Sequence, residues 1–381
     1  MKRIFHVGAW NRNYGDYALG AGLHASLRAE SDEPLEFVLV DCQNTVFHAD
    51  LVDLINREGD LLLVGGGGLV FNRPEDHSRS GWQFNIDLDQ LARLAVPLVV
   101  YGIGYNKFPF DETPFRPQTD AHLRATQEKA ALFSVRNAGT RDELVRRGLE
   151  AEAITIIPDP GMFVPTAPIN LPNLPEGGLK IGLNWAGDRP AHRYPAPAEE
   201  NERAAARAVA EGLAAVLETH DGGGQVILIS HLLGIDATVA PVLRAVLGER
   251  LYVLEEEAPW LFPPALAQTP IWAGLYRLVD VAVGMRGHAN IIPFGLGTPF
   301  VGIGTHNKNR FFASEVGLAD IFVDFGRLQT AEIPSTLHHC VSQTLDDPAV
   351  ARQQKASFEA CWSTARHLNQ RICQKLLKNG K

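Results

Sequence analysis

Two side chains on either side of a glycine, Arg286 and His288, are the ones in this sequence best suited to chemistry on a small anion. They follow the apolar run 279–283, which predicts a buried strand. Both should therefore lie at the carboxyl end of a strand, where open α/β sheets bind their ligands. If the backbone stays extended through Gly287, alternation places both side chains on the same face. We expect Arg286 to bind an anionic group and His288 to transfer a proton near neutral pH.

The chain around this pair carries an excess of positive charge. Between Asp280 and Glu315 there is no acidic residue, yet the segment holds Arg286, Lys308 and Arg310. The whole chain has a formal net charge of −9. A local cationic segment in an acidic protein predicts a site for a small, highly charged anion. Lys308 and Arg310 could also be ordinary surface charges, and of the two we expect Lys308 to face the site.

Asn13 and Asp16 lie where the first predicted strand, 4–8, gives way to a helix predicted over 17–27. Asp16 could cap this helix by accepting hydrogen bonds from the amides at its start. Asp16 could also face the cleft with Asn13, because a carboxylate at a strand end can orient or deprotonate a sugar hydroxyl. The two roles are compatible.

Four consecutive glycines, 65–68, end the strand predicted over 61–64. Glycine tolerates positive φ and lets a ligand approach the backbone closely, and successive bare amides can bind an anion. A tight turn is the alternative, but four glycines exceed what a turn needs. We therefore assign Gly66, Gly67 and Gly68 to substrate binding. The spacing lacks the GxGxxG fingerprint of dinucleotide sites.

Arg136 ends the strand predicted over 132–135. Its planar guanidinium suits a carboxylate or a phosphate, although it could instead pair with a nearby acid. Asp159, between two prolines, is expected to fix the turn between domains rather than to do chemistry. Several polar residues of the second half could reach the cleft or serve only the surface and the core: Arg189, His192, Arg193 and His231.

Strand-like and helical patterns alternate in both halves of the chain, which is typical of βαβ units and a mainly parallel sheet. Six prolines between residues 158 and 175 interrupt this alternation. We expect an α/β protein of two Rossmann-like, doubly wound domains that face an interdomain cleft. The predicted division is an N-terminal domain, 1–165, a linker, 166–178, a C-terminal domain, 179–348, and a helical tail, 349–381.

The composition narrows the classes of function. A chain of 381 residues with 45% hydrophobic and 21% charged residues fits a soluble protein of two domains. Its acidic balance argues against a nucleic-acid partner. The four cysteines have no CxxC or zinc spacing, so we expect reduced thiols, a cytoplasmic protein and no metal site. No run of 18 apolar residues predicts a transmembrane helix. The oligomeric state is not indicated.

Taken in order, these motifs resemble those of the polysaccharide pyruvyl transferase family over residues 4–312. They are N-x-G-D at 13–16, glycines at 65–68, S-x-R at 134–136, D-P at 159–160, R-x-H at 286–288, and G-x-P at 297–299 followed by Lys308. The resemblance implies a fold like that of GT-B glycosyltransferases, with Arg136, Arg286 and His288 acting on the donor. Gly287 departs from the family, which commonly has leucine there, and this changes the shape of the pocket.

The resemblance also implies the reaction. A pyruvyl group passes from phosphoenolpyruvate to hydroxyls of a saccharide acceptor, free or lipid-linked, and forms a pyruvate ketal with release of phosphate. A lipid-linked acceptor would bring peripheral membrane contact. Phosphoenolpyruvate is then a substrate, and no cofactor is expected. Asp16 would hold the hydroxyl of the acceptor, and His288 would be the acid/base.

Two other functions fit the same architecture. The first is a GT-B glycosyltransferase that uses a nucleotide sugar. The absence of a carboxylate between residues 280 and 315, where such enzymes hold the ribose, counts against it. The second is a non-catalytic protein that binds a glycan or a nucleotide. The intact pair of Arg286 and His288 counts against that alternative.

Overall fold

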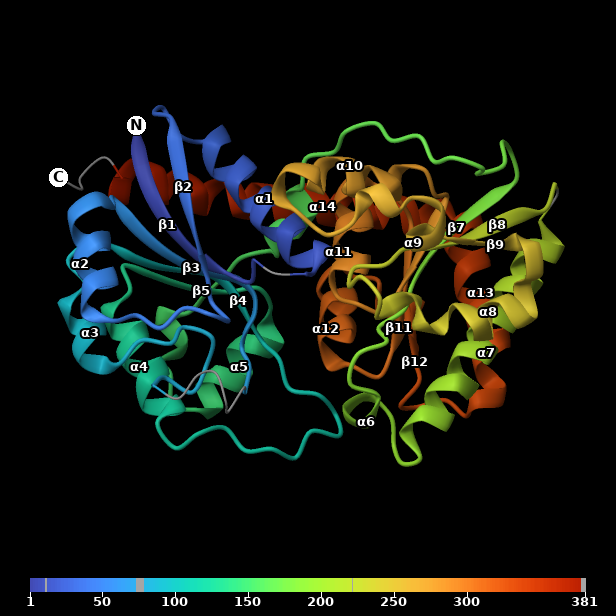
Figure 1. The fold of residues 1–381 in the computed structure, drawn as a ribbon, viewed down its shortest axis with the longest axis horizontal. Coiled ribbons are helices and arrows are strands. Elements are labelled where there is room, and N and C mark those ends of the chain that lie inside the picture. The colour runs from blue at the N-terminus through green and yellow to red at the C-terminus, as the bar shows by residue number, and fades with distance from the viewer. Residues whose placement is uncertain (11, 73–78, 221, 378–381) are drawn as a thin grey trace.

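The computed structural model describes residues 1–10, 12–72, 79–220 and 222–377. Within them, two six-stranded sheets are each flanked by helices (Figure 1). All paired strands are parallel. The strand orders are β2-β1-β3-β4-β5-β6 and β12-β11-β10-β7-β8-β9. The prediction of two doubly wound α/β domains is therefore confirmed.

The first sheet and its helices form the N-terminal domain. Its strands are β1 (Lys2–Gly8), β2 (Leu35–Asp41), β3 (Leu61–Val70), β4 (Leu98–Tyr105), β5 (Leu132–Val135) and β6 (Thr155–Ile156). Its helices are α1 (Tyr14–Ala29), α2 (Ala49–Glu58), α3 (Leu88–Arg93), α4 (Thr119–Lys129) and α5 (Ala138–Arg146). Side-chain oxygens of Asn13, Asp87 and Asn137 cap α1, α3 and α5. Such caps satisfy amides that the first helical turn leaves without partners, and so define where each helix begins.

The second sheet and its helices form the C-terminal domain. Its strands are β7 (Leu179–Asn184), β8 (Gly224–Leu228), β9 (Leu251–Val253), β10 (Val281–Gly284), β11 (Phe300–Gly304) and β12 (Phe322–Asp324). Its helices are α6 (Pro190–Arg193), α7 (Ala198–Thr219), α8 (Ala240–Leu247), α9 (Leu254–Glu257), α10 (Thr269–Ala273), α11 (His288–Leu296), α12 (Asn307–Glu315) and α13 (Ile333–Asp346). Read from its own first strand, this sheet has the 3-2-1-4-5-6 order of the Rossmann fold.

Both sheets contain a point where the direction of chain winding reverses. In the first sheet it lies between β1 and β3, and in the second between β7 and β10. Loops after the strands part to opposite faces at such a point and leave a crevice at the carboxyl ends. Here the two crevices contribute to one cavity between the domains.

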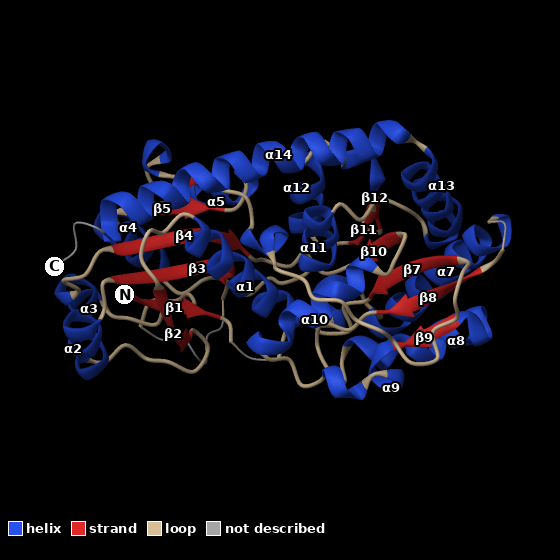
Figure 2. Ribbon diagram, turned by 90° about the horizontal axis from the view of Figure 1, so that it is seen from above, coloured by secondary structure: helices blue, strands red, loops and turns tan. Residues whose placement is uncertain are grey.

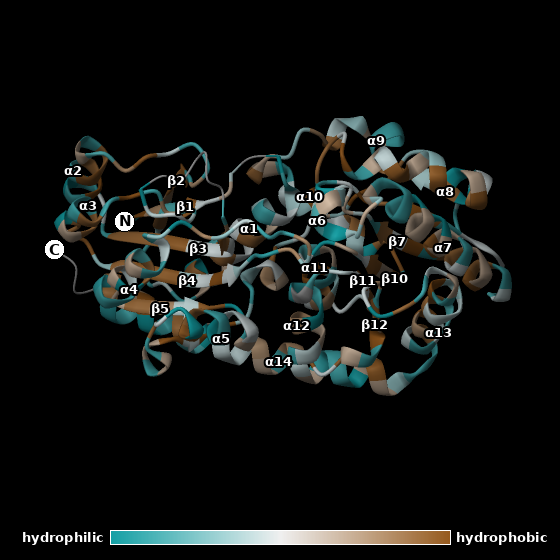
Figure 3. Cartoon of the chain, turned by 90° about the horizontal axis from the view of Figure 1, so that it is seen from below, coloured by the Kyte–Doolittle hydropathy of each residue, from teal (hydrophilic) through white to brown (hydrophobic). Residues whose placement is uncertain are grey.

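The strands carry the apolar core, and the polar residues lie mainly on the outer surfaces of the helices (Figure 3). One part of the core crosses the domain boundary. Tyr14, at the start of α1, stacks on Trp272 of the C-terminal domain with ring centroids 4.5 Å apart and planes 4° apart. Tyr14 is fully buried, and its hydroxyl donates to the carbonyl oxygen of Leu261. The tip of α1 is therefore packed into the second domain.

The chain then returns to the first domain through α14 (Pro348–Arg371), which runs along one side of both sheets (Figure 2). Val350 near its start packs in the second domain, and Leu368 near its end packs against the first sheet. An ion pair of 2.9 Å joins Arg366 to Glu30, the residue that follows α1. A π-helical turn, Ile372–Leu377, continues this packing. No helix in the described part of the chain is long and apolar enough to cross a bilayer.

Candidate functional site

A cavity of about 340 Å³ lies between the two domains, at their facing crevices. Its walls come from the ends of β1 and β10, the glycines of β3, the start of α1 and the loop after β7. Every residue that the sequence analysis assigned to the site lines this cavity: Asn13, Asp16, Gly66, Gly67, Gly68, Arg136, Arg286, His288 and Lys308.

Asn13, and not Asp16, is the cap of α1. Asn13 Oδ1 accepts a hydrogen bond of 2.9 Å from the backbone N–H of Gly15. Asp16 lies in the first helical turn, so the alternative in which Asp16 caps the helix does not hold. Burial raises the pKa of the Asp16 carboxyl, while the nearby His288 and Lys308 partly offset that effect. Asp16 therefore presents a carboxyl group to the cavity beside two cationic or ionisable groups.

The four glycines lie within β3 and not after it, because the strand continues to Val70. Gly65 has φ of +143°, and a Cβ atom there would lie 2.0 Å from the carbonyl oxygen of Tyr101 on β4. Gly67 has φ of +84°, and its Cβ would lie 3.9 Å from Asp16 Oδ1. An extended strand of glycines thus forms a bare backbone wall beside Asp16. The wall allows close approach of a ligand without a tight turn.

Arg136 and His288 meet at Asp159, which comes from the segment between the domains. Arg136 Nη1 donates a hydrogen bond of 2.9 Å to Asp159 Oδ2, and His288 Nε2 lies 3.5 Å from Asp159 Oδ1. Burial on its own raises the pKa of Asp159, but His288 and Arg136 outweigh it and lower that pKa below its usual range. Gly104 leaves room for this arrangement, since a Cβ there would lie 2.4 Å from Arg136 Nε.

His288 reaches the cavity in a way that strand alternation does not describe. Gly287 has φ of −53° and ψ of −52°, so the chain turns into α11 there. The expectation of an extended backbone through Gly287 is wrong, although Arg286 and His288 still line one cavity. The imidazole is held between two glycines. A Cβ at Gly15 would lie 2.6 Å from Nδ1, and one at Gly161 would lie 3.2 Å from Cδ2.

Arg286 is bound by two carboxylates of its own domain. Its Nε and Nη2 contact Asp236 at 2.9 and 2.5 Å, and Nη2 lies 2.8 Å from Asp188. Burial lowers the pKa of Arg286, but Asp236 and Asp188 outweigh this effect and raise it above its usual range. Two acids therefore compensate much of its positive charge, and Nη1 is the nitrogen left for a ligand.

Lys308 follows the first residue of α12 and faces the same cavity. Burial lowers its pKa to about 7, and the positive charges of Arg193 and Arg136 contribute to the lowering. No ion pair joins Lys308 to a carboxylate among the residues that the structure describes. The site thus contains a half-buried amine whose pKa is close to neutral, beside two guanidinium groups. Such an amine gains most from an anionic ligand.

The segment between β4 and α4 forms a bridge over the cavity. Asn106 and Phe108 line the cavity, and Asn106 Oδ1 lies 3.1 Å from His306 Nε2 of the other domain. The backbone N–H of Phe110 donates to the carbonyl oxygen of His192 at 3.2 Å. The Phe108 ring lies 4.9 Å from the Arg193 guanidinium carbon.

Several residues of the site were not predicted from the sequence. Asp159 was expected only to fix a turn, and Arg193 was left between cleft and surface. Arg193 is 3% exposed and pairs with Asp188 at 3.0 Å. Nothing in the sequence singled out Asp188 or Asp236. By contrast, Arg310 lies 3.5 Å from Asp324 and does not line the cavity.

Two histidines complete the walls. His231 Nε2 bonds the Tyr276 hydroxyl at 2.7 Å, and burial lowers the pKa of His231 well below its usual value. Burial also lowers the pKa of His6 to about 4. Both lie in the cavity wall as neutral groups. No cluster of three or more His, Cys, Asp or Glu among the described residues is arranged to hold a metal ion.

Solved structures with the same fold come from several organisms. S. aureus MnaA in complex with UDP is 12% identical, with a TM-score of 0.60 and coverage of 100% of this chain and 99% of that one. The UDP-GlcNAc 2-epimerase from Neisseria meningitidis, bound to UDP-GlcNAc, is 10% identical, with a TM-score of 0.55 and full coverage of both chains. Anabaena HepE in complex with UDP and glucose is 13% identical, with a TM-score of 0.53, covering 99% of this chain and all of that chain. At these identities the likeness shows the GT-B-like fold alone.

At the level of sequence, no curated protein matches the chain. The family model for polysaccharide pyruvyl transferase matches residues 13–307, which span Asn13, the glycines of β3, Arg136, Asp159 and the pair of Arg286 and His288. The chain therefore belongs to the polysaccharide pyruvyl transferase family of transferases.

Proposed function

We propose that this transferase moves a pyruvyl group from phosphoenolpyruvate to two hydroxyls of a saccharide, forming a pyruvate ketal. One observation carries the proposal: Arg136, Lys308 and His288 converge on one polar cavity, and Asp159 contacts both Arg136 and His288 from behind them. A small dianionic group beside a proton-transfer residue is the ligand that this combination fits best. Family membership supports the pyruvyl group, and the cavity supports the anionic donor.

The donor would lie against the least compensated cations. Arg136 gives one of its nitrogens to Asp159, and Lys308 has no carboxylate partner among the described residues. We assign the carboxylate and phosphate of the donor to these two side chains, with Nη1 of Arg286 as a third contact. Each charge-assisted hydrogen bond contributes about 1.5–3 kcal/mol. A donor anion would also keep Lys308 protonated.

The proposed chemistry balances without a co-reactant. A proton adds to the methylene carbon, C3, which makes C2 electrophilic. The oxygen of one sugar hydroxyl forms a bond to C2, and the C2–O bond to phosphate breaks. The second hydroxyl oxygen then bonds to C2 and closes the ketal. Of the two hydroxyl protons, one replaces the proton delivered to C3, and the other leaves with the phosphate.

The roles of the side chains follow from their positions. We assign His288 as the group that delivers the proton to C3, with Asp159 holding the imidazole in place. The 3.5 Å contact between them is long, as catalytic contacts often are before the substrate binds. Asp16 would accept the proton or a hydrogen bond of the attacking hydroxyl, beside the glycine wall of β3. The acceptor is a saccharide, free or lipid-linked.

The proposal is tested by thermal unfolding with millimolar phosphoenolpyruvate or a panel of nucleotide sugars. A ligand that binds only the folded protein stabilises it by about 2.7 kcal/mol at a hundredfold excess over Kd. Lys308→Gln removes a cation of the cavity. Arg310→Gln on the same helix removes one that pairs with Asp324 outside it. We expect phosphoenolpyruvate to stabilise the wild type and Arg310→Gln, and to stabilise Lys308→Gln much less.

Other outcomes would favour other functions. Stabilisation by a nucleotide sugar alone would replace the donor and support the glycosyltransferase. If a saccharide binds and no phosphate is released from phosphoenolpyruvate, the protein binds glycans without turnover. Release of phosphate that depends on the saccharide, with a new ketal methyl signal in its NMR spectrum, is the result we expect.

A further inference from the structure

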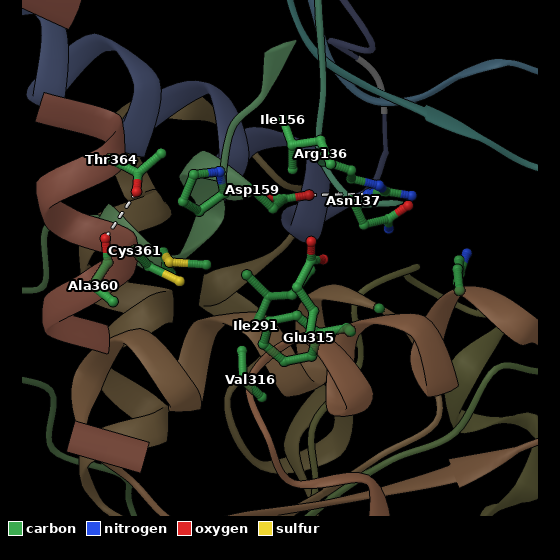
Figure 4. Close-up of a pocket in the computed structure, with 15 residues that line it drawn as sticks. Arg136, Asn137, Ile156, Asp159, Ile291, Glu315, Val316, Ala360, Cys361 and Thr364 are labelled. Carbon is green, nitrogen blue, oxygen red and sulfur yellow. Dashed lines mark hydrogen bonds and ion pairs between the residues drawn. The ribbon is translucent and has the colours of Figure 1, made fainter. Parts of the chain in front are cut away.

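A second cavity of about 200 Å³ adjoins the cleft between the domains. Figure 4 shows its walls, which come from three parts of the molecule. Arg136 and Ile156 belong to the first domain, Ile291 and Val316 to the second, and Ala360 to α14. Most of the lining is apolar, unlike that of the cleft, which is rich in charged and polar groups.

The two cavities share three residues: Arg136, Gly287 and Lys308. Among these, Gly287 is the position where no side chain separates them. Its backbone has φ of −53° and ψ of −52°, which any residue can adopt. A Cβ there would meet its nearest neighbour, Asn309 Oδ1, at 3.7 Å, an ordinary contact. Neither strain nor crowding therefore requires glycine, and with glycine there no side chain of residue 287 stands at the boundary of the two cavities.

Two acidic residues, Asp159 and Glu315, lie in the wall of this cavity. The Asp159 carboxylate is bonded to Arg136 and lies 3.5 Å from His288, so its charge is compensated at the end shared with the cleft. Glu315 is exposed as a residue, but its carboxyl lies partly out of solvent, which raises its pKa to about 7 and leaves it partly protonated near neutral pH. That carboxyl accepts a hydrogen bond from the backbone N–H of Ala138. The thiol of Cys361 is also neutral, because burial raises its pKa to about 11. The remaining charges are those of Arg136, Lys308 and Asp159. Arg136 and Lys308 line both cavities, and Asp159 is bonded to Arg136, so all three lie at the end shared with the cleft.

The size of the cavity limits what it can hold. An engineered cavity of about 150 Å³ lined by apolar side chains binds benzene. A cavity of about 200 Å³ therefore accommodates one ring or a branched chain of similar size. Because the two cavities meet at Gly287, Arg136 and Lys308, an occupant of the second cavity can belong to the same molecule as a sugar bound in the cleft.

We propose that this second cavity binds an apolar, ring-sized group attached to the saccharide acceptor, which passes beside Gly287 while the sugar stays in the cleft. The identification of the ligand as the saccharide acceptor rests on the proposed function. The existence of an apolar binding site does not. The enzyme would then select among sugars by what is attached to them, in addition to the hydroxyls that receive the pyruvyl group.

The first experiment measures the cavity alone, with 4-fluorophenol as the probe and fluorine NMR as the readout. Ala360→Phe places a ring at the wall that α14 contributes. Ala356→Phe makes the same change one turn earlier on the same helix, at a residue that is exposed like Ala360 but lies outside the lining. We expect the probe to bind the wild type and Ala356→Phe, and Ala360→Phe to weaken it about tenfold or more. Equal binding to both variants, or no binding to the wild type, overturns the proposal.

The second experiment asks whether one ligand spans both cavities. Phenyl and methyl glycosides of the same sugars are compared as competitors of 4-fluorophenol, in the wild type and in Gly287→Leu. Leucine at this position would close the passage but leave the second cavity open to the small probe. We expect the phenyl glycosides to compete about tenfold better than the methyl glycosides in the wild type. Gly287→Leu should abolish that preference while it keeps the affinity for 4-fluorophenol.

If Gly287→Leu leaves the phenyl preference unchanged, the passage is not used and the proposal fails. Stabilisation by phosphoenolpyruvate is measured separately on the same variants. If phosphoenolpyruvate does not stabilise the wild type, that result counts against the proposed function alone. A preference for phenyl glycosides would still establish the second cavity as a binding site.

Discussion

At the scale of single residues, the contact between Asp159 and His288 is the one that best separates catalysis from binding. His288→Ala removes the proposed proton donor and leaves Arg136 and Lys308 in place. Since general acid–base catalysis contributes about 10²–10⁴-fold in rate, we expect kcat to fall by that factor. The thermal shift caused by phosphoenolpyruvate should be nearly unchanged. A variant with wild-type kcat would show that another group transfers the proton.

Lys308 should make donor binding depend on pH. Its pKa of about 7 in the protein without ligand means that it loses its proton as the pH rises above neutrality. Affinity for phosphoenolpyruvate should therefore be highest near pH 7 and fall by on the order of tenfold for each further pH unit. Titration calorimetry from pH 7 to 9 measures this. Lys308→Arg keeps its charge over that range, so its affinity should vary little with pH.

The same lowered pKa affects stability with the opposite sign. Between about pH 7 and the usual lysine value of 10.5, the folded protein holds fewer protons at Lys308 than the unfolded chain does. Lys308 therefore makes the ligand-free protein more stable as the pH rises through this window. The lowered pKa of Lys308 predicts that donor affinity falls while the stability of the ligand-free protein rises with pH. If both rise together, titration of Lys308 does not control donor binding.

Residues at strand ends were predictable, and their partners were not. Because the carboxyl ends of parallel strands meet at one edge, Arg136, Arg286 and the glycines of β3 could be placed near the cleft from the order of elements alone. Asp236 lies 50 residues before Arg286 in a segment with no motif. Its pairing depends on how η3 (Asp236–Val239) packs beside β7, which no local pattern encodes.

At the scale of elements, the glycines of β3 are required by the neighbouring strand as well as by the ligand. Gly65→Ala would place a Cβ 2.0 Å from the carbonyl oxygen of Tyr101, at a φ of +143°. We expect this substitution to lower the free energy of unfolding by about 3 kcal/mol or more. Gly222→Ala is the control, because Gly222 also has positive φ but has nothing within 4 Å of its Cβ.

The control should cost about 1 kcal/mol, the cost of an unfavourable backbone conformation alone. Urea unfolding of both variants measures the difference. If both substitutions lower the free energy of unfolding equally, β3 and β4 can move apart without loss of stability. From the sequence, the four glycines were predicted to bind the substrate but to lie after the strand. They lie within β3 because pairing with β4 continues the strand through them, which no local pattern indicates.

At the scale of the whole molecule, α14 joins the two domains. Leu368 is 4% exposed and packs against the first sheet. Leu368→Ala should lower the free energy of unfolding by about 2–5 kcal/mol, as for other buried leucines. His367→Ala, at the exposed neighbouring position, should change it by less than about 0.5 kcal/mol. Chemical denaturation of both variants tests this, and similar values would mean that α14 contributes little to holding the domains.

The general division into two α/β domains could be predicted because helical and strand patterns alternate on both sides of a proline-rich segment. The way the domains are joined could not. The stacking of Tyr14 on Trp272 and the return of α14 depend on contacts between distant segments. In the sequence, Tyr14 belongs to a motif at the cleft, and nothing marks it as part of the core of the other domain.

The arrangement of these connections has a mechanical consequence. The buried tip of α1 and helix α14 hold the two domains together by apolar packing along one edge of the molecule. The bridge over the cavity contacts the second domain through fewer groups: the hydrogen bond between Phe110 and His192, the contact between Asn106 and His306, and the Phe108 ring beside Arg193. We expect this bridge to open more readily than the apolar packing of α1 and α14. We expect a ligand to enter and leave where this bridge opens, at the cost of these few contacts, while the packing of α1 and α14 keeps Asp16, Arg136 and His288 in position.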